Sequence, residues 1–85
     1  MADLHEVTVK VISQMGTCGA GHKVGDEFVV GYLTPPGVCS WAYNSIWAFV
    51  AALQTGGNFP WDEEGRAVVA CPDSANPVVF ELKRK

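Results

Sequence analysis

The chain has 85 residues, which is enough for one domain with one small core. Hydrophobic residues make up 48% of the sequence, too large a share for a disordered chain. The formal net charge is −3, and this argues against nucleic-acid binding because affinity for phosphates rests mainly on Lys and Arg. We therefore expect a single globular domain over residues 1–85 whose partners do not include nucleic acid.

The first two expected elements are strands. Residues 7–12 are β-branched and alternate, with Val7, Val9 and Val11 on one face. A glycine-rich loop follows, and the second strand covers residues 27–32. Each strand has one apolar face, as expected for a sheet that is packed on one side.

A turn and a helix come next. Two prolines within residues 34–37 forbid both a helix and a central strand, so this segment must be a turn. Ser40 is a favourable N-cap for a helix of about four turns. Gly56 and Gly57 follow as a C-cap. Apolar residues recur on one helical face at Ala42, Ile46, Phe49, Val50 and Leu53.

The last two strands cover residues 66–70 and 78–83, joined by a turn-rich connection. The order ββαββ predicts an α+β fold in which a mostly antiparallel four-stranded sheet packs against the helix. A small closed or half-closed barrel capped by the helix is the competing architecture. The predicted core comprises Val7, Val9, Val11, Phe28, Val30, Ile46, Phe49, Val50, Leu53, Val68, Val78, Phe80 and Leu82.

No targeting segment is expected at the N-terminus, because residues 1–6 are polar and acidic with no basic region before an apolar run. The longest nearly apolar stretch, residues 46–53, is far shorter than the roughly 20 residues that a membrane span needs. We therefore expect a cytoplasmic protein without membrane association. Thiols stay reduced in that compartment, and an odd number of cysteines does not suggest a disulfide framework.

The three cysteines fall at the ends of expected elements. Cys18 lies in the glycine-rich loop after the first strand, Cys39 directly precedes the helix, and Cys71 ends the third strand. His22 follows Cys18 by four positions, a spacing that lets both side chains reach one ion. Thiolates are soft ligands that suit zinc, iron or an iron–sulfur cluster.

Two kinds of metal site are compatible with these residues. Cys18, His22, Cys39 and Cys71 would supply a tetrahedral Cys₃His set for zinc. Three thiolates alone could hold an iron–sulfur cluster with one open iron. No C-x₂₋₄-C knuckle of the kind common in such proteins occurs, and three half-buried thiols that only fill space remain an alternative. The leading interpretation is a metal- or cluster-binding protein that acts as a redox accessory or carrier.

A thiol enzyme is the second interpretation. Cys39 lies beside a helix N-terminus, where exposed N–H groups and the positive end of the dipole favour a thiolate nucleophile. Such a nucleophile needs a base, and His22 and Asp73 are the candidates. Asp73 could equally begin the turn that follows Cys71.

A binding module without chemistry is the third interpretation. Trp41 and Trp61 could line a pocket for a flat ligand or a surface for a partner protein, although packing would also account for them. An edge strand could pair with a second copy into a homodimer, but nothing in the sequence selects that outcome.

The sequence resembles an uncharacterised family of small prokaryotic proteins of about this length. The matching segments lie between Cys18 and Leu82: GVCSWA at 37–42, GGNFPW at 56–61, CPD at 71–73 and PVVFEL at 77–82. The GGNFPW segment is unusual and therefore fairly specific. The resemblance implies that Cys18, Cys39 and Cys71 belong to the family's pattern, and it implies no activity.

Overall fold

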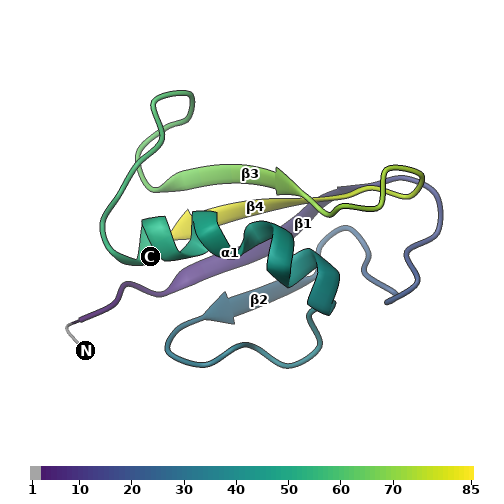
Figure 1. Cartoon of the computed structure of the whole chain (residues 1–85), viewed down its shortest axis with the longest axis horizontal. Coiled ribbons are helices and arrows are strands. Elements are labelled where there is room, and N and C mark those ends of the chain that lie inside the picture. The colour runs from purple at the N-terminus through teal and green to yellow at the C-terminus, as the bar shows by residue number, and fades with distance from the viewer. Residues whose placement is uncertain (1–2) are drawn as a thin grey trace.

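The computed structural model describes residues 3–85, which form one open sheet with one helix against it (Figure 1). The elements in chain order are β1 (Val7–Gln14), β2 (Glu27–Val30), α1 (Ser40–Gln54), β3 (Arg66–Ala70) and β4 (Val78–Arg84). The strand order is β2-β1-β4-β3 and each neighbouring pair is antiparallel. The predicted α+β fold and the order ββαββ are confirmed. The competing barrel is wrong, because β2 and β3 are the two edges of the sheet and do not pair.

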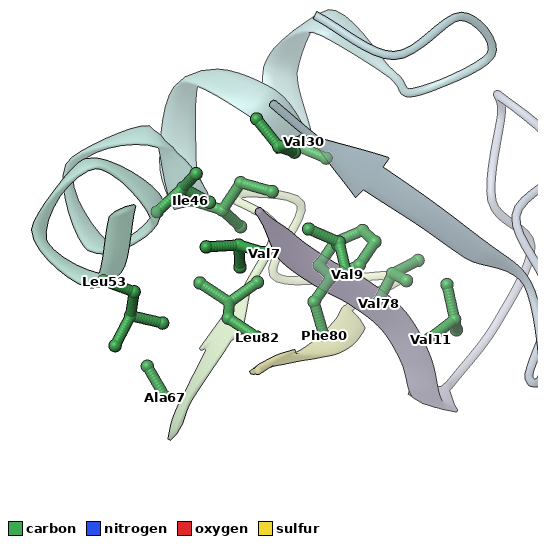
Figure 2. Close-up of a cluster of buried hydrophobic side chains, with 12 residues drawn as sticks. Val7, Val9, Val11, Val30, Ile46, Leu53, Ala67, Val78, Phe80 and Leu82 are labelled. Carbon is green, nitrogen blue, oxygen red and sulfur yellow. The ribbon is translucent and has the colours of Figure 1, made fainter. Parts of the chain in front are cut away.

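Helix α1 covers one face of the sheet, and the core fills the space between the two layers (Figure 2). Inward side chains come from alternate strand positions and from one face of the helix, as their periods of 2 and 3.6 residues require. Burying such side chains stabilises the fold by about 1.5–3 kcal/mol each. The fully packed set is Val7, Val9, Val11, Val30, Ala42, Ile46, Val50, Leu53, Ala67, Val78, Phe80 and Leu82.

The prediction for β3 is wrong in one respect, because Val68 faces away from the helix and is 40% exposed. Pairing with β4 sets Ala67 opposite Leu82 and Val69 opposite Phe80, which are inward positions. Opposite residues of an antiparallel pair point to the same face, so Val68 points outward. Two other predicted core residues, Phe28 and Phe49, pack against the core but remain partly exposed.

Strand β1 extends two residues beyond the predicted end. Its register with β4 shifts between Val11 and Ser13, and this irregularity leaves Ile12 unpaired and 38% exposed. Strand β2 is shorter than predicted and ends at Val30. The chain then passes through the proline-containing turn to the start of α1.

The C-terminus of α1 has the glycine cap that the sequence predicts. Gly56 has a φ of +90°, its N–H donates to the Leu53 carbonyl, and the Gly57 N–H donates to the Ala52 carbonyl. This pair of bonds is the Schellman arrangement, which satisfies carbonyls at a helix end. The N-cap, however, is Cys39 and not Ser40.

Arg84 connects the last strand to the end of the helix. Its guanidinium donates to the Leu53 carbonyl at 3.1 Å, to the Gly57 carbonyl at 2.6 Å and to Asn58 Oδ1 at 2.9 Å. Asn58 Oδ1 also accepts the Gly65 N–H. A cation at a helix C-terminus opposes the negative end of the dipole, so these contacts stabilise both α1 and the loop after it.

Within the part of the chain that the structure describes, no helix has the length and apolar character needed to cross a membrane.

Candidate functional site: a pocket lined by three cysteines

The three cysteines lie on three segments that meet at one end of the sheet. Cys18 is in the β1–β2 loop, Cys39 directly precedes α1, and Cys71 directly follows β3; all three segments lie at the right-hand end of Figure 1. The three are free, partly buried thiols, and they line one pocket of about 450 Å³. The structure therefore brings together the cysteines that the sequence places at element ends.

Cys18 is positioned by contacts between its own loop and the β3–β4 loop. The Thr17 N–H donates to Asn76 Oδ1 at 2.9 Å, and the Met15 N–H donates to the Pro77 carbonyl at 3.0 Å. Gly16 lies between them with a φ of +69°, so close to the Asn76 amide that a Cβ would overlap it. Only glycine meets both the backbone conformation and the close approach.

Cys39 is held by a buried histidine. The Cys39 N–H donates to His22 Nε2 at 3.0 Å, and the imidazole is only 5% exposed. The rings of Phe28 and Phe80 approach it edge to face, with centroid distances of 5.5 and 6.1 Å. The bond from the Cys39 amide requires an unprotonated Nε2, so the neutral ring carries its proton on Nδ1.

Cys71 forms two hydrogen bonds with Val78 across the β3–β4 connection. The Cys71 N–H donates to the Val78 carbonyl at 2.9 Å, and the Val78 N–H donates to Cys71 Sγ at 3.3 Å. The helix holds the same strand end, because Ser45 Oγ donates to the Ala70 carbonyl at 2.7 Å. The Cys71 sulfur therefore has a fixed position and accepts one backbone hydrogen bond.

The rest of the pocket wall is mostly apolar. Trp41 from the first turn of α1 and Pro72 from the β3–β4 loop contribute the larger groups. Trp41 is 72% exposed, so this part of the pocket wall lies at the protein surface. A concave apolar site of this size with a few polar groups has the character of a ligand pocket.

Asp73 lines the pocket but is engaged as the cap of its own turn. Its Oδ1 accepts the N–H groups of Ala75 and Asn76, both at 3.2 Å, and its Oδ2 accepts the Asn76 side-chain amide at 3.3 Å. These are the contacts of an Asp that begins a turn. Asp73 therefore begins the turn after Cys71, which is one of the two roles that the sequence suggests for it.

The described side chains do not form a binding site for a single metal ion. Zinc bound by thiolates has Zn–S distances of about 2.3 Å, which gathers the ligand atoms around one point. Among residues 3–85, no three His, Cys, Asp or Glu side chains are arranged to hold a metal ion in this way. His22 Nε2 in addition already accepts the Cys39 N–H.

Trp61 lies away from this pocket. It follows the last turn of α1, whereas Trp41 lies in the first, and it is 69% exposed. Its indole stacks on Phe59 with a centroid distance of 5.1 Å, and Phe59 contacts Phe49 of the helix at 5.3 Å. The two indoles therefore do not form one binding site.

A network of charged side chains lies away from the cysteines, at the start of β3. Arg66 bonds to Asp62 at 3.0 Å and to Glu81 at 2.9 Å. The hydrogen bond from Arg66 holds the pKa of Asp62 below its usual value of 3.8. The hydrogen bonds that Arg66 donates to Glu81 and Asp62 raise the pKa of Arg66 above its usual value. Both effects stabilise charged forms, as expected for opposite charges in contact.

Sequence reasoning missed the residues that position the cysteines. Asn76 and Ser45 act through contacts with residues 59 and 25 positions away, respectively, which no local pattern reveals. Gly16 carried a weak signal, since a glycine in a loop suggests a turn or a close backbone approach.

We compared the chain with protein-family models, with curated proteins and with solved structures, and none of the three comparisons finds a match.

Proposed function

We propose that the protein is a cytoplasmic iron–sulfur protein, a redox accessory or cluster carrier, in which Cys18, Cys39 and Cys71 bind one cluster. The observation that carries this proposal is the convergence of all three thiols on one apolar pocket. Soft thiolates around an apolar cavity are a usual environment of such clusters.

A cluster accounts for the pocket better than a single zinc ion does. In a cluster each thiolate binds a different iron, so the sulfur atoms lie farther apart than around one ion. The pocket volume of about 450 Å³ leaves room for a group larger than one ion. We propose that the same three thiols bind this group.

Two local contacts suit sulfur ligands at this pocket. The Val78 N–H donates to Cys71 Sγ, and hydrogen bonds to ligand sulfur atoms are one of the features that tune clusters. Cys39 is the N-cap of α1, and within the described residues no side chain caps this helix start. The positive end of the helix dipole therefore acts on the Cys39 thiolate without competition from an acidic residue.

A thiol enzyme has less support, because both candidate bases are engaged. His22 Nε2 accepts the Cys39 amide proton, and the carboxylate of Asp73 accepts three hydrogen bonds from its own turn. Among the described residues, neither His22 nor Asp73 forms a hydrogen bond with the Cys39 thiol. Cluster binding needs no base.

The test is purification without oxygen, followed by iron and sulfide analysis and visible absorbance spectroscopy. We expect about one cluster per chain with charge-transfer absorbance. Replacing Cys18, Cys39 or Cys71 by Ala should each remove most of the bound iron. Ser74→Ala is the matched control, because Ser74 is exposed in the same loop as Cys71.

Three results would contradict the proposal. One is iron well below one equivalent after anaerobic reconstitution. Another is stoichiometric zinc with no sulfide, which would indicate a single-ion site. The third is unchanged iron content in all three cysteine variants.

A further inference from the structure

The pocket wall contains one hydrogen-bond donor without an acceptor in the described chain, the Nδ1–H of His22. Its Nε2 accepts the Cys39 N–H at 3.0 Å, so the neutral ring carries its proton on Nδ1. Among residues 3–85, no group accepts a hydrogen bond from Nδ1. No fully buried side-chain nitrogen or oxygen of these residues lacks a partner, so Nδ1 must reach open space. The ring is 5% exposed and lines the pocket, and this donor therefore faces the pocket.

The start of α1 adds further donors at the same end of the pocket. Cys39 is the N-cap, its first turn holds no acidic residue, and within residues 3–85 no side chain caps this helix. Trp41 and Ala42 of that first turn line the pocket. N–H groups without acceptors and the positive end of the helix dipole favour an electron-rich oxygen here. Because His22 bonds to the N-cap residue, its ring lies beside the helix start.

The rest of the wall favours an uncharged ligand with an apolar body. In the described chain no Lys or Arg lines the pocket, whereas Asp73 does. An anion would therefore meet a negative charge and no compensating cation, which makes its burial costly. Pro72 and Val78 offer apolar surface, and the indole of Trp41 can stack on a flat group. A volume of about 450 Å³ is within the usual range for small-molecule sites.

We propose that this pocket binds a small, flat, uncharged carbonyl compound. Its oxygen accepts the Nδ1–H of His22 beside the start of α1, and its hydrocarbon part lies against Trp41 and Pro72. The inference goes beyond the proposed cluster and concerns the iron-free chain, because a cluster and this ligand would use the same space. Only non-covalent contacts form, so no bond breaks and no electron is transferred.

The test is a titration of iron-free, reduced, ¹⁵N-labelled protein followed by nuclear magnetic resonance. Three probes share one phenyl ring: acetophenone has the carbonyl oxygen, α-methylstyrene has a CH₂ group in its place, and benzoate carries a negative charge. With acetophenone we expect saturable binding and a downfield shift of the His22 Nδ1–H proton. α-Methylstyrene should give no such shift, and benzoate should bind at least about tenfold more weakly than acetophenone. These comparisons need no variant to fold.

Two tryptophan variants test the position of the ligand. Trp41→Ala should weaken acetophenone binding about two- to tenfold, the value of one aromatic contact. Trp61→Ala is the matched control, because its indole is similarly exposed, at 69% against 72%, and lies outside the pocket. It should leave the affinity unchanged.

Four outcomes would each overturn the inference. They are no saturable binding of acetophenone, an equal downfield shift with α-methylstyrene, benzoate that binds as tightly as acetophenone, and equal effects of the two tryptophan variants. Iron and sulfide analysis decides the proposed cluster separately, so either proposal can fail while the other stands.

Discussion

Replacing Gly16 tests how the fold positions Cys18. A Cβ at Gly16 would overlap Asn76 Oδ1 and approach the Ala75 carbonyl oxygen to 3.3 Å, while Asn76 Oδ1 accepts the Thr17 N–H. Gly16→Ala must therefore separate the two loops that carry Cys18 and Cys71, or strain the backbone to keep them together.

The expected cost has two parts. A left-handed backbone conformation costs a residue with a Cβ about 1–2 kcal/mol. Loss of the Thr17–Asn76 hydrogen bond adds about 0.5–1.5 kcal/mol. We therefore expect Gly16→Ala to lower the free energy of unfolding by about 1.5–3.5 kcal/mol. In a domain of this size, each kcal/mol corresponds to about 4–8 °C in Tm.

Gly21→Ala is the matched control. Gly21 lies in the same loop with a φ of +80°, but a Cβ there would meet nothing within 4 Å. It should carry only the backbone cost of about 1–2 kcal/mol. Urea denaturation followed by tryptophan fluorescence measures both variants, and alkylation of Cys18 by iodoacetamide reports on its loop. Equal destabilisation by the two variants, with equal rates of Cys18 alkylation, would show that Gly16 has no special role in positioning Cys18.

Three further predictions concern the contacts around the core. His22→Phe keeps an aromatic ring but leaves the Cys39 N–H without its acceptor. It should cost about 1–2 kcal/mol and speed hydrogen exchange of that amide, and unchanged exchange would contradict the role given to His22. Arg84→Ala should cost about 2–3 kcal/mol in urea denaturation, because charged hydrogen bonds to helix-end carbonyls are lost. Arg84→Lys should recover less than half of that loss, since an ammonium lacks the planar fork, and full recovery would count against this explanation. Arg66 lowers the folded-state pKa of Asp62, so the stability that this pair contributes is present above pH 3.8 and is lost as the pH falls through the folded pKa. Asp62→Asn should flatten the acid limb of the stability profile below pH 3.8, and an unchanged slope there would argue against the pair.

The secondary structure could be predicted because its causes are local. Alternating β-branched residues specify β1, the apolar stripe specifies α1, and the Gly56–Gly57 pair ends the helix. The orientation of β3 could not be predicted in this way. Residues 67–70 are all apolar, so the strand has no alternation, and pairing with β4 decides which side chains face the helix.

The positions of Cys18, Cys39 and Cys71 at the ends of elements could be predicted from the sequence. That these ends meet is a property of the fold. The order β2-β1-β4-β3 makes β1 and β3 run in the same direction, so the loops after them leave the sheet at the same end, where α1 begins. The contacts that set the cysteines within that end, Thr17 with Asn76 and Cys39 with His22, join residues far apart in the chain. Such contacts depend on three-dimensional packing and leave no periodic pattern in the sequence.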